Sequence, residues 1–492
     1  LSFLFRIYEY QDYEEYPEPH DALIDQDNYV WIADGKLGLV KTKVWNPYIN
    51  FVTEGPLLAF AYDMSMGNRT IWVATGGTTG PFHNQYRTLG VMKYKDYKWE
   101  AYHKTLIPGL DTVFDFVHVC IDPSNPDRAY GSTWGQGVYV FNQDGIETVY
   151  DHTNSSLQKR ASVNDHVRVG GSAFDKSGNL WVSNSETERP VSVRTPDGQW
   201  ISFGTDGKVP SNTIMSKIMV DSYNQKWVIL GKGFGILVLK ESGFDTPNDV
   251  DARVLTAIEN QGGLPSSSVY AIVEDLDNNI WIGTDKGATV IYNPQAVTNG
   301  NAVNAQQILV ELGGFYGPLL ESELVTCIAV DGANKKWFGT ERSGVFLMSS
   351  DGRTLIQNFN AENSPLLSNN VTSIVIDDIS GEVYFGTDKG IISYRGIATK
   401  AGSDFKDVMA FPNPVREDYY GPIAIKGLVR DANVKITDIS GNLVFETIAE
   451  GGQAIWDGKK LNGQRPASGV YLVFVSNDDG SQTIVTKILF VN

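Results

Sequence analysis

Short runs of alternating apolar and polar residues, separated by polar turns, fill most of the chain. A clear example is DLDNNIWIGTDKG at 275–287, which follows an apolar run, turns at an Asp and Asn cluster, and continues as a strand that carries Trp281. A Gly-containing turn and a second apolar run, ATVIY, come next. Alternation with a period of two predicts strands, and the Asn and Gly clusters predict the turns between them. Because no helical period is sustained, the pattern predicts an all-β protein.

The same unit recurs through residues 25–390. Close copies begin at Asp25, Asp175, Asp221, Asp331 and Asp377. Two looser copies cover 63–80, with a longer turn, and 122–137, with Tyr in the aromatic place. The aromatic anchors recur about every 50 residues, and four short strands in such a repeat form one blade of a β-propeller. The eight anchors are Trp31, Trp72, Tyr130, Trp181, Trp227, Trp281, Trp337 and Tyr384.

Eight copies allow two arrangements of four-stranded antiparallel blades. About seven could close one propeller, with the first copy or so completing an upstream propeller missing from this chain. The absence of an initiator Met and of a signal peptide fits a mature or truncated piece of that kind. Alternatively, all eight copies form one ring. The sequence therefore predicts a propeller of seven or eight blades over residues 1–403.

The recurring features of the repeat have a structural explanation that needs no function. Asp before an Asn or Gly pair closes a tight hairpin by accepting hydrogen bonds from its own backbone. A Trp in the following strand is large enough to fill the wedge between neighbouring blades. The anchors are therefore expected to be structural.

The units resemble the two-component regulator propeller repeats, which form sensor blades in hybrid histidine kinases. The resemblance rests on the D-x-x-G-N-L-W-I-G-T-x-x-G core and covers residues 25 to about 396. It implies a propeller, but not by itself a sensor.

The period stops after Gly396, and a linker over 397–403 leads into a different pattern. Residues 404–492 predict about seven short strands with Gly turns, which is typical of a small antiparallel β-sandwich. The order of elements resembles the C-terminal sorting domain of the type IX secretion system. The residues that carry this resemblance are Pro412, Asn413, Pro414, Asp438, Gly441, Trp456, Asp457, Gly458, Gly463, Gly469, Tyr471 and Lys487.

Charge narrows the range of partners. The 492 residues carry a net charge of −18, and because residues 405–492 hold nine basic and ten acidic side chains, −17 of it belongs to the rest of the chain. A field of this sign repels polyanions, so nucleic acid is not an expected partner. No run of 18 apolar residues is present, so the chain is not expected to be an integral membrane protein.

Candidate chemistry is sparse. Cys120 and Cys327 lie in apolar strand-like runs and are expected to be free thiols facing the same side of equivalent strands. Asp275, Asp277 and Asn279 match the first half of a calcium loop, but without the later Glu they are better explained as a hairpin turn. No catalytic motif is present, so the sequence predicts no enzyme, no catalytic residue, no metal and no cofactor; the ligand-binding residues are not identifiable.

A regulator-type propeller followed by this sorting domain resembles the PorZ family of the type IX secretion system. The resemblance implies a non-enzymatic surface component, exported through the periplasm to the outer-membrane exterior. Its implied partners are the translocon, a PorU-type sortase and a PorV-type shuttle, together with anionic lipopolysaccharide, which the negative propeller disfavours. Two alternatives stay open: a secreted cargo protein (propeller enzyme or glycan binder) with a cleavable sorting domain, and a periplasmic ligand sensor.

Overall fold

The computed structural model describes residues 7, 10, 16–43, 48–51, 55–161, 165–312 and 314–491. They divide into two compact units, Leu1–Pro56 and Leu57–Asn492. The first unit contains one antiparallel sheet in the order β1-β2-β3-β4, with strands Pro19–Ile24, Val30–Asp34, Gly38–Thr42 and Ile49–Phe51. Strand β2 carries Trp31, so the first copy of the repeat folds as a sheet of its own.

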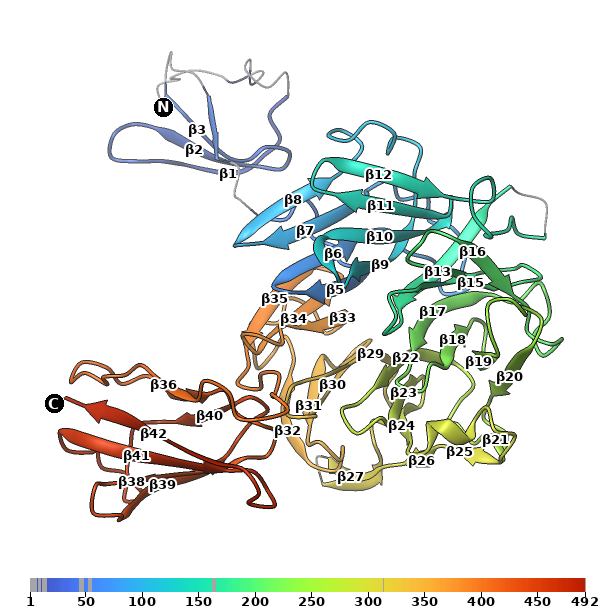
Figure 1. The fold of residues 1–492 in the computed structure, drawn as a ribbon. Helices are drawn as coiled ribbons and strands as arrows, with labels where there is room; N and C mark the ends of the chain where they lie inside the picture. Colours follow the sequence, from blue (N-terminus) through green and yellow to red (C-terminus); the bar gives the residue numbers. More distant parts are fainter. Residues whose placement is uncertain are drawn as a thin grey trace. The chain divides into compact units, whose positions relative to one another are not determined.

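Seven antiparallel blades follow one another around a ring in the described part of residues 57–395, from blue β5 to orange β35 (Figure 1). The second and third blades are hydrogen-bonded to each other as one eight-stranded sheet. The first four blades are β5 to β8 (Asp63–Gly67, Thr70–Ala74, Val91–Lys95, Lys98–Tyr102), β9 to β12 (Phe116–Asp122, Asn125–Gly135, Val138–Asn142, Gly145–Tyr150), β13 to β16 (Val167–Phe174, Leu180–Asn184, Val191–Arg194, Trp200–Phe203) and β17 to β20 (Met215–Val220, Lys226–Leu230, Gly235–Glu241, Val250–Leu255). The last three are β22, β23, β24 and β26 (Val269–Glu274, Ile280–Thr284, Gly287–Ile291, Gln306–Gln307), β29 to β32 (Val325–Val330, Lys336–Thr340, Val345–Met348, Leu355–Phe359) and β33 to β35 (Val371–Ile376, Glu382–Thr387, Gly390–Arg395).

Short elements complete the loops of the ring. Strand β21 (Gln261–Gly262) pairs with β25 (Val303–Asn304), and β27 (Leu309–Leu312) pairs with β28 (Phe315–Pro318). The single helix of the described residues is a 3-10 turn at Pro294–Ala296. No helix in this part of the chain is long and apolar enough to cross a membrane.

The ring closes between its seventh and first blades. The Thr372 hydroxyl donates to the Ala61 carbonyl at 2.5 Å, and the Met64 N–H donates to Ser373 Oγ at 3.1 Å. Residues more than 300 positions apart in the chain are thus hydrogen-bonded across the closing seam. Of the two counts that the repeats allowed, the structure adopts the seven-bladed ring.

Within a blade, one Asp side chain holds both the first turn and the aromatic anchor. In four blades the Trp indole N–H donates to the Asp six residues earlier, over 2.8–3.1 Å; the pairs are Trp181 with Asp175, Trp227 with Asp221, Trp281 with Asp275, and Trp337 with Asp331. Trp31 makes the same bond to Asp25 in the first unit, at 2.8 Å. The sequence pattern predicts only the turn role of the Asp, so the bond to the indole is an additional role.

Most anchors are buried, as a wedge between blades requires. Trp72, Tyr130, Trp181, Trp227, Trp281 and Trp337 are buried, whereas Trp31 and Tyr384 are half-buried. Trp72 belongs to the copy with the longer turn, and its indole N–H donates to the Pro126 carbonyl at 3.1 Å instead of to an Asp.

Residues 405–491 form a two-sheet sandwich. One sheet has the order β36-β37-β40 (Met409–Phe411, Ile423–Lys426, Gln453–Trp456). The other has the order β39-β38-β41-β42 (Leu443–Ile448, Asn433–Thr437, Gly469–Ser476, Thr483–Phe490). Trp456, Tyr471 and Phe490 pack together between the sheets. The all-β fold predicted from the sequence, a propeller followed by a small sandwich, is confirmed.

The Asp to indole bond can be tested in the fourth blade. Replacing the buried Asp221 with Ala removes the acceptor for the Trp227 indole and for the Tyr223 and Gln225 backbone N–H groups. Buried donors without partners are costly, so we expect the free energy of unfolding to fall by about 3 kcal/mol in urea titration. Asp144→Ala, at an exposed turn, is the control and should change it by less than about 0.5 kcal/mol. Equal effects of the two substitutions would contradict this role for Asp221.

Candidate functional site

One residue from each blade forms a layer around the central channel of the ring. In each blade, one residue of the innermost strand pairs with the aromatic anchor, and the layer residue lies two positions before it. In the fourth blade, for example, Met219 pairs with Trp227, and Lys217 is the layer residue. The seven residues are Asp63, His118, Gly171, Lys217, Ala271, Cys327 and Ser373. All except Gly171 line a cavity of about 420 Å³.

Three charged side chains of this layer form a buried ion cluster. Lys217 Nζ donates to Asp63 Oδ1 at 2.8 Å, and His118 Nδ1 contacts Asp63 Oδ2 at 2.7 Å. His118 Nε2 lies 2.8 Å from the Ser172 carbonyl oxygen. The Asp63 and His118 side chains are 5% and 15% exposed, whereas that of Lys217 is 34% exposed. Lys217 is therefore the member of the cluster that the channel leaves most accessible.

The hydrogen bonds fix the charges of the cluster. A carbonyl oxygen and an ionised carboxylate only accept, so both His118 nitrogens must donate and the imidazole is protonated. Burial alone would lower the pKa of His118, but the Asp63 carboxylate overcomes this and raises it to about 10. Burial alone would raise the pKa of Asp63, but Lys217 and His118 lower it to about 2. At neutral pH the three groups carry a net charge of +1.

A glycine allows the cluster to form across a whole blade. Asp63, His118 and Lys217 come from the first, second and fourth blades, and Gly171 occupies the layer in the third. A Cβ on Gly171 would lie only 3.0 Å from the Lys217 Cα, so a side chain there would push the fourth inner strand away. Gly171 thus lets Lys217 come close enough to reach Asp63.

The position of Asp63 corrects the predicted alignment of the repeat at 63–80. The copy at 63–80 was aligned with Asp63 as its turn residue, but β5 begins at Asp63 and turns only after Gly67. Asp63 therefore lies four residues before the turn, as His118 and Lys217 do in their blades. Comparing that position across all repeats would have revealed the charged layer.

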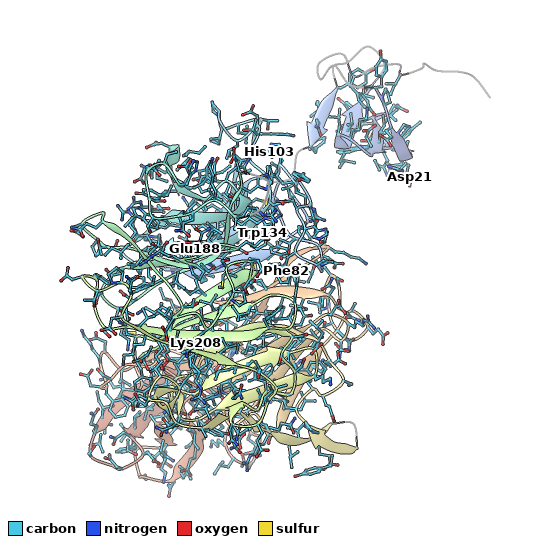
Figure 2. The ribbon with its side chains drawn as sticks, turned by 90° about the vertical axis from the view of Figure 1, so that its right-hand side faces the viewer. Asp21, Phe82, His103, Trp134, Glu188 and Lys208 are labelled. Atoms are coloured by element: carbon cyan, nitrogen blue, oxygen red, sulfur yellow. The ribbon has the colours of Figure 1, made fainter. Side chains whose placement is uncertain are left out.

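The channel opens toward a second cavity, of about 360 Å³, which shares Lys217, Ile229 and Thr326 with the first. Tyr62, Tyr270 and Phe82 contribute aromatic side chains to this mouth. Phe82 comes from the long β6–β7 connection and lies beside Trp134, with ring centroids 6.1 Å apart (Figure 2).

Both cysteines are free thiols and line the central cavity. Burial raises the pKa of the Cys327 thiol to about 11, so this thiol stays protonated at neutral pH. The two cysteines lie on the same side of equivalent strands, as predicted, but in adjacent layers of the channel.

The calcium-like residues are engaged in protein contacts. Asp275 accepts the Trp281 indole and pairs with Lys336 at 3.0 Å. Asp277 pairs with Arg430 of the sandwich at 2.8 Å and accepts from Asn334. Asn279 donates to Asp275. Among the described residues, no group of three or more His, Cys, Asp or Glu side chains is arranged to hold a metal ion.

The sequence-predicted motif residues of the sandwich lie in its turns and core. Asn413, between Pro412 and Pro414, is bound to β42: its Nδ2 donates to the Lys487 carbonyl, and its Oδ1 accepts from the Leu489 N–H. Trp456 is buried, and Tyr471 donates its hydroxyl proton to the Ala467 carbonyl. Asp438 and Asp457 accept backbone N–H groups of their turns, and the turn glycines with positive φ are Gly441, Gly458, Gly463 and Gly469.

The sandwich is docked on the ring through the linker. Thr399 bridges to Gly451, and Gly402 bridges to Val429. A Cβ on Gly332 of the sixth blade or on Gly451 would lie 2.0 Å from the Thr399 carbonyl oxygen, so the linker passes between two surfaces that only glycine permits.

Comparison with known proteins now supports these assignments. The family model of the secretion system C-terminal sorting domain matches residues 409–491, and that of the two component regulator propeller matches residues 263–286. No curated protein matches the chain. PorZ, a surface component of the type IX secretion system of Porphyromonas gingivalis, superposes with a TM-score of 0.68 at 24% identity, over 96% of this chain and 65% of that chain. This chain is PorZ-like in fold.

Two further structures are more distant. The extracellular domain of the putative one component system BT4673 from B. thetaiotaomicron has a TM-score of 0.47 at 14% identity, with 96% of this chain and 63% of that chain covered. Virginiamycin B lyase from Staphylococcus aureus has a TM-score of 0.46 at 13% identity, with 68% and 94% covered.

The resemblances stated from the sequence are confirmed for the propeller repeat, the sorting domain and the PorZ-like fold. The chain spans less than two thirds of the PorZ chain that it matches. The sorting domain, together with the likeness to PorZ, indicates a protein that is exported to the cell surface.

The buried cluster predicts how stability depends on pH. Folded His118 keeps its proton up to a pKa of about 10, whereas the unfolded side chain loses it near 6.5. The bound proton therefore contributes stability that is complete below pH 6.5 and is lost as the pH rises toward 10. We expect His118→Gln to cost about 3 kcal/mol at neutral pH, because Asp63 loses a charged partner, and to cost less at each higher pH.

Urea titrations of both chains from neutral pH to pH 10 would measure this difference. His83→Gln, at an exposed position, is the control and should show no such trend. A His118→Gln cost that is the same at every pH would show that His118 is not protonated in the folded chain.

Proposed function

We propose that this chain is a non-enzymatic component of the type IX secretion and attachment machinery at the outer-membrane surface. The observation that carries the proposal is the presence in one chain of a PorZ-like propeller and a sorting domain docked on it.

The sorting domain offers a surface for the proposed protein partners, which are the translocon, a PorU-type sortase and a PorV-type shuttle. The outer face of β41 and β42 exposes Val470, Phe474, Val485 and Leu489 around the Lys487 side chain. Exposed apolar side chains gathered on one sheet face are typical of protein interaction sites.

The docked linker favours a retained sorting domain over the alternative of a cleavable cargo tag. A protease needs an extended, accessible segment, whereas residues 399 and 402 are held by backbone pairing to the sandwich. Under this proposal the propeller and the sorting domain act as one surface protein.

Deletion of 405–492 tests the role of the sorting domain. We expect the tagged propeller to be lost from the cell surface, because the export signal is gone, while the full-length chain is displayed. Phe474→Glu, which changes only an exposed residue, should reduce display without lowering the melting temperature. Surface labelling of intact cells would measure this, and normal display of the deleted chain would overturn the assignment.

The mass of the surface protein separates the two alternatives that remain after this test. Retention predicts that the surface form still contains residues 405–492. Loss of about 85 C-terminal residues on intact-mass measurement would instead identify a cargo protein with a cleavable tag.

We further propose that the chain holds anionic lipopolysaccharide for delivery to the sortase. The support is the PorZ-like fold and the sorting domain; the net charge of −17 on residues 1–404 acts against it. Purified protein should retain anionic lipopolysaccharide in a pull-down at low salt and lose it as salt rises, because screening weakens the local attraction. Equal retention of a lipopolysaccharide that lacks the anionic polysaccharide would contradict this ligand.

A further inference from the structure

The central channel is positively charged inside an acidic ring. Its titratable lining groups are Asp63, His118, Lys217, Cys120 and Cys327. The carboxylate neutralises only one of the two cations, and burial keeps the Cys327 thiol neutral. Because low-dielectric walls surround the channel, a group inside it senses this local charge more strongly than each of the distant, solvent-screened charges at the outer surface.

The free space of the cavity lies next to the cation that is accessible. In the charged layer, the first, second and fourth blades supply the ion cluster, whereas the fifth, sixth and seventh supply Ala271, Cys327 and Ser373. These three side chains are short, so they leave room beside the Lys217 ammonium. Lys217 also lines the mouth cavity, which gives a path from outside the ring and has one carboxylate in its lining, that of Glu341.

The Lys217 ammonium has donors left for a ligand with hydrogen-bond acceptors. Its Nζ donates to Asp63 Oδ1, whereas an ammonium can donate three hydrogen bonds. Because the Lys217 side chain is 34% exposed toward the cavity, its remaining donors can reach a bound molecule.

We propose that the central channel binds a small molecule through a carboxylate or phosphate group held by Lys217. The His118 imidazolium keeps Asp63 neutralised, so that Lys217 presents an unbalanced positive charge to the ligand. The cavity of about 420 Å³ suits a metabolite rather than a polymer. This site is separate from the sorting domain and goes beyond the proposed surface role.

Calorimetry of the full chain with inorganic phosphate and with acetate, at constant ionic strength in chloride, tests the proposal. We expect one of the two anions to bind with one-to-one stoichiometry, and the anion that binds identifies the ligand group. Lys217→Met should weaken binding at least tenfold, because it leaves only the neutral Asp63–His118 pair in the channel. Lys208→Met removes the same charge from an exposed position and should leave binding unchanged (Figure 2).

A second variant keeps the test independent of folding. Lys217→Arg retains the charge and should retain binding, with an unchanged melting temperature. The proposal is overturned if neither anion binds, if chloride competes equally with both, or if a folded Lys217→Met chain binds as well as the wild type.

Discussion

In four of the seven blades, the hydrogen bond between a turn Asp and the Trp six residues later is the constraint on which the position of the inner strand depends. The Asp carboxylate uses one oxygen for the backbone of the first turn and the other for the indole, as Asp221 does for Gln225 and Trp227. The bond thereby fixes how far the inner strand extends before it turns, and so which of its residues face the channel. Lys217, four residues before Asp221, is placed in the charged layer by this register.

The blades could be predicted from the sequence because each one repeats the same short pattern of turn residues and aromatic anchor. The turn residues and the aromatic wedge lie within about a dozen residues of one another, and the pattern recurs often enough to reveal the period. The first blade escaped a correct alignment because Trp72 bonds to the Pro126 carbonyl of the next blade, so no Asp is needed in its turn. The sorting domain was also recognisable, since its turn glycines and core aromatics follow one another along a short stretch of chain.

The channel cluster could not be predicted in the same way, because its members come from blades that are distant in sequence. Asp63 and Lys217 are 154 residues apart, and their contact depends on ring closure and on the absence of a side chain at Gly171. Comparing the repeats would show that both residues occupy the same strand position, but not that their side chains meet. His118 was visible only as one of six histidines, and its protonation follows from two acceptors that the fold brings to its two nitrogens.

The effect of charge on a partner therefore depends on where the charged side chains lie as well as on the net charge of the chain. The value of −17 describes residues 1–404 as a distant charged molecule would sense them. A group inside the channel instead senses Lys217 and His118 against a single carboxylate, with little solvent between them. Asp277 shows the same principle at the surface: it is one of many acidic residues in the sum, yet its carboxylate binds Arg430 and ties the sorting domain to the fifth blade. Part of the acidity of the ring is thus used in holding the molecule together, and only the remainder is available to repel an anionic partner.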